Sequence, residues 1–373
     1  SDESSSSSSS VSLPKPKRPT VVQYWGANKG SGWWPWDDPS TFQDMLKQCR
    51  VDCVFLSNNA SDEEMKAADA VLFHGPFTPG NNPEGFMKQY GKGPHQSFWL
   101  LTLESHSNHP FQNSPELLKD IDHRMTYELD NEVPITYANH VWKNSFYHLN
   151  TTKRTDGDAI VINSNCGPKN QRLVWVRAIS KKLRVDSYGR CDHNKDWDGD
   201  HGGMGSLKKM KVQGSYKFCL TFENTNQRDY VTEKYYHALA AGCLPVYMGA
   251  PNIDDYLPHP DAVIKAADFD SPEALADYMQ YLLDHPAEYD KRLAWKRTRD
   301  DAKPVGLERL QKLQYLSLAT GPCRLCEYLA GVSSERTPEE ENKMYEESLA
   351  AMVAMQPWKE QMDNGAVRRR LYY

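Results

Sequence analysis

The sequence predicts an α/β fold with parallel sheets, and the stretch 217–249 is the strongest sign of it. That stretch, KFCLTFENTNQRDYVTEKYYHALAAGCLPVYMG, has the order strand, polar loop, helix, strand. Within 218–222, apolar side chains run up to Glu223 and Asn224, as in a buried strand with a polar carboxyl end. With 373 residues, 39% of them hydrophobic, the chain is long enough for two α/β domains, each with its own core.

The helix of this unit should begin near Asp229 to Thr232, whose side chains can cap its free N–H groups, and end at Gly242. A strand should follow at 244–248. A helix start at the carboxyl edge of a parallel sheet favours a bound phosphate. Lys234 lies in the first turn, where a cation costs its own helix about 0.3–1 kcal/mol. A bound anion would explain this lysine, although a lysine there can also point into water.

The first domain is expected over residues 20–150, behind a Ser- and Pro-rich stem at 1–19 that cannot form a core. Its elements follow from short apolar runs. We expect strands at 21–24, 53–57, 70–73 and 98–103, and a helix at 44–50. Glu104 follows the last of these strands, and a carboxylate at the carboxyl end of a strand is well placed to face a cleft. The alternative is a solvated or ion-paired glutamate.

The second domain is expected over residues 151–332, with the boundary in a polar stretch at 143–158 that lacks periodicity. Its remaining elements are strands at 159–163, 185–191 and 262–265, and helices at about 171–183, 271–282 and 289–295. Arg172 lies where the first of these helices begins, and its planar guanidinium can bind a pyrophosphate through two parallel hydrogen bonds. The alternative is a surface arginine.

A helical tail is expected over 333–373, because Thr337-Pro338-Glu339-Glu340 forms a capping box with proline at the first helical position. This tail can pack across the domains or mediate assembly. The run 192–206 contains Asp-x-Asp spacings at Asp196, Asp198 and Asp200. It lies in a Gly-rich stretch and lacks the late glutamate of a calcium loop, so a solvated loop is the simpler interpretation.

Composition excludes several classes of function. The net charge is −6 and basic residues form no stripe, which argues against nucleic-acid binding. No run of about 18 apolar residues occurs, so the sequence as given does not span a membrane. The eight cysteines and the glycosylation sequons at Asn59 and Asn150 favour a secretory compartment with disulfides. Zinc binding by Cys49, Cys53, Cys323 and Cys326 is the alternative. Cys166 and Cys191 should lie on adjacent strand ends, where they can form a disulfide.

Several segments of the chain resemble one family. FENTNQRDYVTEK followed by AAGCLPVYMGAPNIDDYLP resembles the signature of the α1,3-fucosyltransferases of glycosyltransferase family ten, which transfer L-fucose from GDP-β-L-fucose to glycans. LESHSNHP is similar to the family's Glu-Ser-Pro/His segment, and VDSYGRC to its Val-Asp-x-Tyr-Gly-x-Cys. The likeness covers about residues 20–330. Departures are His106 in place of a frequent proline, and Glu128 and Leu129 in place of two arginines.

This resemblance implies a GT-B fold of two facing Rossmann-like domains, with the acceptor on the first and GDP-fucose on the second. Glu104 would be the general base of an inverting transfer, and Arg172 and Lys234 would neutralise charge on the departing GDP. No obligate metal is expected, although a divalent ion can still stimulate the transfer. The terminal Cys323-x-x-Cys326 would be tied back to Cys49 and Cys53. The expected donor-binding residues are Asn165, Arg172, Tyr188, Glu223, Asn224, Tyr230, Glu233 and Lys234.

Three segments bear on the acceptor. SNCGPKN, VDSYGRC and ENTNQRDYVTEK most resemble the plant and invertebrate enzymes that fucosylate the innermost GlcNAc of N-glycans, which is the acceptor we expect. Alternatives are LacNAc or Lewis-type glycans, protein Ser or Thr hydroxyls, and a non-catalytic GDP-sugar-binding protein. The resemblance also implies the Golgi lumen. Because the sequence begins at Ser1 rather than at methionine, we expect a type II membrane anchor to be missing from it.

Overall fold

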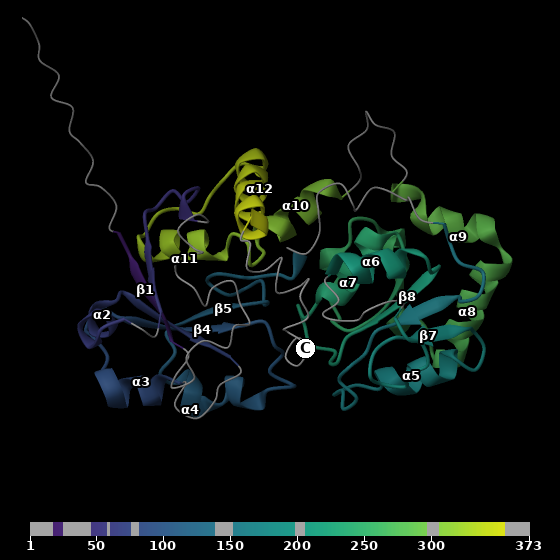
Figure 1. Ribbon diagram of the computed structural model, residues 1–373, viewed down its shortest axis with the longest axis horizontal. Coiled ribbons are helices and arrows are strands. Elements are labelled where there is room, and N and C mark those ends of the chain that lie inside the picture. The colour runs from purple at the N-terminus through teal and green to yellow at the C-terminus, as the bar shows by residue number, and fades with distance from the viewer. Residues whose placement is uncertain are drawn as a thin grey trace, which may run out of the picture.

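A computed structural model describes residues 18–24, 46–57, 60–75, 82–138, 152–197, 206–296 and 306–354. Two parallel sheets lie side by side, each with helices against it (Figure 1). The expected helix at 44–50 is described only from residue 46, and its last helical residue is Leu46. Residues 1–17 of the stem, Asp198, Asp200, and the asparagines of the sequons at Asn59 and Asn150 lie outside the described residues.

The first sheet has the order β2-β1-β3-β4-β5, with every neighbouring pair parallel. Its strands are β1 (Thr20–Tyr24), β2 (Val54–Leu56), β3 (Ala70–His74), β4 (Ser97–Thr102) and β5 (His123–Thr126). The helices between them are α2 (Asp62–Ala67), α3 (Pro83–Tyr90), the 3-10 turn η2 (Pro110–Asn113) and α4 (Pro115–Leu118). The four strands expected from the apolar runs are confirmed to within one or two residues, and β5 was not predicted.

The second sheet has the order β10-β9-β8-β6-β7, again parallel throughout. Its strands are β6 (Ala159–Val161), β7 (Val185–Ser187), β8 (Phe218–Phe222), β9 (Leu244–Met248) and β10 (Ile264–Lys265). Its helices are α5 (Arg172–Ile179), α6 (Ser206–Gly214), α7 (Glu233–Ala241), α8 (Pro272–Asp284) and α9 (Pro286–Leu293), with 3-10 turns η5 (Ile253–Tyr256), η6 (Pro260–Ala262), η7 (Ala266–Asp268) and η8 (Ala294–Lys296). The strand expected at 262–265 is shorter, because η6 takes up Ala262.

Both sheets have the strand order 2-1-3-4-5 when their strands are numbered along the chain. In such a sheet the connections leave in opposite directions on either side of the first strand, and this opens a crevice at the carboxyl ends of the first and third strands. In the second sheet that crevice lies beyond β6 and β8. The strand order therefore predicts that a ligand of the second domain binds at the carboxyl ends of β6 and β8.

Alternating strand residues build a core on each face of the first sheet. Val21, Leu72 and Trp99 face one side with Leu325, whereas Val22, Val71 and Phe98 face the other. Leu325 belongs to α11 (Gly321–Leu329), which follows α10 (Leu307–Tyr315). The chain thus returns from the second sheet to complete the core of the first. The domain limits at 150 and 332 remain a prediction, and α11 packs with the first sheet although it precedes residue 332.

Four disulfides are present among the described residues. Cys49–Cys323 and Cys53–Cys326 tie α11 to the first domain, as the resemblance implied, so these cysteines are not free to bind zinc. Cys166–Cys191 is also as expected. Cys219–Cys243 was not predicted, although both residues lie at the starts of neighbouring strands.

The tail contains α12 (Pro338–Ala354), which packs along α10 and stands above the first sheet in Figure 1. Thr337 and Glu340 form the predicted capping box. The helix also contacts the first domain, because Gln48 donates to Ser348 Oγ at 3.0 Å and Arg50 pairs with Glu340 at 3.1 Å. Among the described helices, none has the length and apolar character needed to cross a bilayer.

Candidate active site

The amino-terminal end of α7 is the centre of the site. Thr232 caps the helix, and Gly242 ends it in the left-handed conformation, as predicted. Glu223 follows β8 and is fully buried. Its Oε1 accepts from Thr232 N at 2.8 Å, and both its oxygens accept from Thr232 Oγ1 at 2.9 and 2.8 Å. A carboxylate of the chain itself therefore satisfies the anion preference of this helix start.

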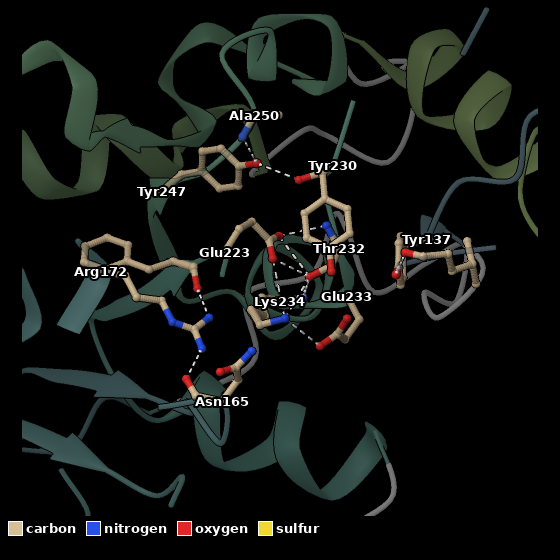
Figure 2. A network of polar contacts seen from close by, with 12 residues as sticks. Tyr137, Asn165, Arg172, Glu223, Tyr230, Thr232, Glu233, Lys234, Tyr247 and Ala250 are labelled. Atoms are coloured by element: carbon tan, nitrogen blue, oxygen red, sulfur yellow. Dashed lines mark hydrogen bonds and ion pairs between the residues drawn. The ribbon is translucent and has the colours of Figure 1, made fainter. Parts of the chain in front are cut away.

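Gly249 makes the position of Glu223 possible. A Cβ atom at Gly249 would lie 2.6 Å from Glu223 Cγ and 2.5 Å from the hydroxyl of Tyr247, so only glycine fits there. The Tyr247 hydroxyl accepts from Ala250 N at 2.9 Å and donates to Tyr230 O at 3.4 Å (Figure 2). The turn after β9 thereby fixes both Glu223 and the loop that carries Tyr230.

Lys234 is the second residue of α7, and its ammonium is held by neighbouring oxygens. Nζ lies 3.1 Å from Thr232 Oγ1, 3.2 Å from Glu233 Oε1 and 3.5 Å from Glu223 Oε2 (Figure 2). Burial lowers the pKa of Lys234, but Glu233 and Glu223 outweigh that effect and leave it raised. The side chain as a whole is 23% exposed.

Arg172 is the first residue of α5, at the crevice between β6 and β8, and is only 1% exposed. Nη1 donates to Phe222 O at 3.0 Å and Nη2 to Asn165 O at 2.7 Å (Figure 2). Burial lowers the pKa of Arg172, opposed by Glu223. Two of the five N–H groups of Arg172 therefore hold main-chain carbonyls, and its Nε has no hydrogen-bond partner among the described residues. Glu223 and Glu233 also offset the charge of the two cations.

Glu104 lies two residues beyond β4 and faces α7 from the first domain. Its Oε2 accepts from the Tyr230 hydroxyl at 3.4 Å and lies 4.0 Å from His109 Nε2. Burial raises the pKa of Glu104, and the charges of His109 and Lys234 partly offset this. The carboxylate that the sequence singled out therefore lies in the same cluster as Tyr230 and Lys234, although 130 residues separate it from the lysine in sequence.

The loop between β8 and α7 joins the two domains. Gln227 Nε2 donates to His106 Nδ1 at 2.6 Å and to the hydroxyl of Tyr127, while Ser107 Oγ donates to Gln227 Oε1 at 3.2 Å. Asp229 adopts a positive φ of 62° and accepts from Tyr256 at 2.9 Å. Asp229 had been considered as a helix cap, but the capping residue is Thr232, and Asp229 fixes the loop instead.

Three of the expected donor-binding residues have side chains with no described hydrogen bond to Glu223 or Lys234. Asn165 contributes its main-chain carbonyl to Arg172, and its Oδ1 accepts from Gly167 N at 2.9 Å. Asn224 Oδ1 is buried and has no hydrogen-bond partner within the described ranges. The Tyr188 hydroxyl instead lies 3.0 Å from the Tyr216 hydroxyl and accepts from Arg154 Nη1 at 3.5 Å. None of its contacts in the described part of the chain reaches Glu223 or Lys234.

Sequence patterns did not reveal several residues of the cluster. The Tyr137 hydroxyl donates to Leu103 O, and its ring lies 6.3 Å from that of Tyr230 (Figure 2). Tyr127 packs its ring 5.1 Å from Tyr230 on another side. Both lie near Glu128, in a segment whose sequence points only to the replacement of two family arginines by Glu128 and Leu129. Among the residues that the structure describes, no three His, Cys, Asp or Glu side chains gather as metal ligands would.

Comparisons with known proteins identify the family of this chain. Residues 151–346 match the model of the glycosyltransferase family 10 (fucosyltransferase) carboxyl-terminal domain. A fucosyltransferase-like protein of Arabidopsis thaliana is 30% identical over 294 residues, which are 78% of this chain and 53% of that protein. GDP-fucose protein O-fucosyltransferase 3 of Danio rerio is 32% identical over 270 residues, 68% of this chain and 57% of that protein. This chain therefore spans little more than half the length of either relative.

The fold is also that of a solved enzyme. A crystal structure of an α1,3-fucosyltransferase superposes with a TM-score of 0.56 and 18% identity, covering 89% of this chain and 96% of that one. The expected pair of Rossmann-like domains in the GT-B arrangement is thus confirmed at the level of the fold.

Proposed function

Because the chain belongs to glycosyltransferase family 10, the fucosyltransferases, we propose that it transfers L-fucose from GDP-β-L-fucose to an acceptor hydroxyl with inversion. One observation supports this most. The Glu104 carboxylate of the first domain accepts from Tyr230 of the second at 3.4 Å, and the charge of Lys234 acts on it. The carboxylate proposed as the base and the cation proposed to bind phosphate thus belong to one cluster across the domains, which supports an inverting transfer.

The second domain would hold the donor. Lys234 and the N–H groups at the start of α7 would take the diphosphate, which would replace part of the contact between Lys234 and Glu233. Arg172 would add positive charge near the diphosphate, and its hydrogen bonds would fix the main chain at Asn165 and Phe222. Asn224, Tyr230 and Glu233 would position the fucose and ribose hydroxyls; Asn224 Oδ1 has no hydrogen-bond partner among the described residues, and the Glu233 side chain is partly exposed. The assignment of Tyr188 to the nucleotide stays a prediction.

The bond changes follow from these positions. The acceptor oxygen would bond to the anomeric carbon of fucose as the bond from that carbon to the β-phosphate oxygen breaks on the opposite face. The acceptor proton would pass to Glu104, and GDP would leave with the electron pair, its charge stabilised by Lys234. A buried carboxylate with a raised pKa is a stronger base than an exposed one, which suits this role. No protein-bound metal enters the proposal.

We propose the innermost GlcNAc of N-glycans as the acceptor. Protein Ser or Thr is the second candidate, because a relative named as a protein O-fucosyltransferase matches 68% of this chain. Disulfides persist in oxidising compartments, so the four present here support the secretory pathway. Location in the Golgi lumen through an anchor outside this sequence is part of the same proposal.

The test is incubation with GDP-fucose and a panel of N-glycans, N-acetyllactosamine and folded protein domains, read by mass spectrometry. We expect Glu104→Gln to abolish transfer while GDP still raises the melting temperature as in the wild type. Glu116→Gln changes an exposed carboxylate on α4 and should leave transfer unchanged. Unchanged turnover in Glu104→Gln would remove the assigned base. Stabilisation by GDP without fucose release from the wild type would favour a non-catalytic binding protein.

A further inference from the structure

His109 is a titratable residue beside Glu104 to which the proposed reaction gives no role. It follows Glu104 by five residues and lies immediately before η2. A turn anchored by the buried Ser105 folds the segment between them. The main-chain N–H of His109 donates to Ser105 O at 3.0 Å, and that of Asn108 donates to Ser105 Oγ at 3.3 Å. The turn returns the imidazole to the carboxylate, so that His109 Nε2 lies 4.0 Å from Glu104 Oε2.

The two described partners of the Glu104 carboxylate lie on the same oxygen. Tyr230 donates its hydroxyl to Oε2 at 3.4 Å from the second domain, and His109 approaches Oε2 from the first. Within the described ranges, no hydrogen bond or ion pair reaches Oε1. Contacts between catalytic groups are often long in an empty site and shorten when the substrates bind. This arrangement therefore holds one oxygen in place and leaves the other to accept a proton.

Several charged and titratable groups face Glu104. Besides His109, these are Tyr230 on the loop before α7, Glu233 and Lys234 on α7, and Tyr137 after β5. Burial raises the pKa of Glu104 most and Glu233 raises it further, whereas His109 and Lys234 lower it. Two cations therefore favour the ionised form of the proposed base, one from each domain.

A bound diphosphate would change this balance. It would lie against Lys234, and its negative charge would cancel the effect of that ammonium on the Glu104 carboxylate. His109 lies in the first domain, outside the proposed diphosphate site, and its contact with Glu104 would remain. In the donor complex, His109 is then the cation on which the ionised state of the base depends.

We propose that His109 is a positioning residue of the transfer, whose imidazolium fixes Glu104 Oε2 and keeps the carboxylate ionised after GDP-fucose has bound, so that Oε1 takes the proton of the acceptor hydroxyl. This inference rests on the proposed function and deepens it. An imidazole gains its positive charge as the solution becomes mildly acidic, which is where a buried carboxylate would otherwise become protonated. His109 therefore extends the working range of the base toward lower pH.

The first variant is His109→Gln, which keeps a polar nitrogen in the side chain but removes the charge. The measurement is the pH dependence of kcat/KM for the acceptor at saturating GDP-fucose, which reports the base in the donor complex. Because the base works only when ionised, loss of the nearby charge should move the acid limb of this profile to higher pH by roughly one unit. At a pH below the limb the variant should be roughly tenfold slower, whereas above it the two proteins should be nearly equal.

Two further variants separate charge from packing. His109→Lys restores a positive charge and should place the acid limb at the wild-type position or below it. His95→Gln changes an exposed histidine before β4 and should leave the profile unchanged. A histidine that merely filled space would change the rate by the same factor at every pH. If His109→Gln does not fold, an acid limb of His109→Lys above that of the wild type would contradict the inference.

The outcomes distinguish this inference from the function on which it rests. An acid limb of His109→Gln that coincides with that of the wild type would overturn the role of His109. If Glu104→Gln is inactive in the same assay, the base and the fucosyltransferase would stand. Full transfer by Glu104→Gln would remove the base and the role of His109 together. A wild type that transfers fucose to no acceptor would overturn both the function and the inference.

Discussion

The charge of Lys234 is balanced by two carboxylates of the chain itself. Glu223 approaches from β8 and Glu233 from the same helix, at 3.5 and 3.2 Å. Without Glu223, the first turn of α7 would combine helix N–H groups and an ammonium with no buried counter-charge, which is costly. With it, the site is nearly neutral when empty, and a diphosphate would exchange one anion for another. This explains how a lysine can lie where the helix disfavours it.

Lys296 is the residue whose charge should make stability depend on pH. Its ammonium, 2% exposed, donates to Leu239 O near the end of α7, and burial lowers its pKa to about 7. Its pKa in the unfolded chain is about 10.4, so between pH 7 and 10 the unfolded state binds more protons. Stability contributed here therefore rises with pH over that window.

Chemical unfolding at pH 7, 8 and 9 checks this sign. The free energy of unfolding of the wild type should increase more steeply with pH than that of Lys296→Met. Lys291→Met changes an exposed lysine on α9 and should follow the wild type. Parallel curves for wild type and Lys296→Met would contradict a depressed pKa.

At the scale of elements, two of the described helices, α7 and α12, begin with a threonine whose side chain caps the helix, but in different surroundings. Thr232 at the start of α7 is buried and bonds to Glu223 and Lys234. Thr337, before α12, accepts from the main-chain N–H of the exposed Glu340. We expect Thr232→Val to lower stability by about 1–2 kcal/mol and to weaken GDP binding, because Glu223 loses its hydroxyl donor. Thr337→Val should cost about 1 kcal/mol or less and leave GDP binding unchanged.

Thermal unfolding with and without GDP distinguishes these cases. Equal losses of GDP stabilisation in the two variants would mean that the Thr232 hydroxyl serves the helix alone.

Local features of this part of the fold could be predicted from the sequence, whereas contacts between distant segments could not. The limits of β8, α7 and β9 follow from local signals, namely apolar runs, a cap and a glycine, all within the 31 residues from Phe218 to Met248. Glu104 and Lys234 were chosen because each lies at a strand or helix end of a recognisable segment. Tyr137 and Gln227 were missed because their contacts, with Leu103 and with His106 and Tyr127, join residues 34 to 121 positions apart. No local pattern records such contacts.

At the scale of the whole molecule, the chain leaves the second sheet and returns to the first. The bridge between Thr136 and Ser317, and the donation from Thr136 Oγ1 to Leu313 O at 2.6 Å, mark the point of return. Beyond it α11 enters the first core, and α12 packs on α10 and reaches Arg50. The two domains are therefore linked twice along the chain, which limits how far Glu104 can move from α7.

Two disulfides fasten this return, and they should act together. Cys49–Cys323 and Cys53–Cys326 close nearly the same loop, of 274 and 273 residues. With one in place, the other closes only the small ring made by the few residues between neighbouring cysteines. By the loop-entropy relation, removing either one costs about 2–3 kcal/mol, but removing both also opens the large loop and costs about 8 kcal/mol in total. The double loss therefore exceeds the two single losses added together.

Melting temperatures of the oxidised protein measure this excess. Three variants are compared: one with Cys49 and Cys323 changed to alanine, one with Cys53 and Cys326 changed to alanine, and one with all four changed. The matched comparison is removal of Cys166–Cys191 and Cys219–Cys243, whose separate loops of 25 and 24 residues should give additive losses. Because α11 also packs Leu325 into the first core, the four-alanine variant should lose fucose transfer at a lower temperature than either two-alanine variant. Additive losses at the paired bridges would mean that packing of α11, rather than the covalent ties, holds the return segment in place.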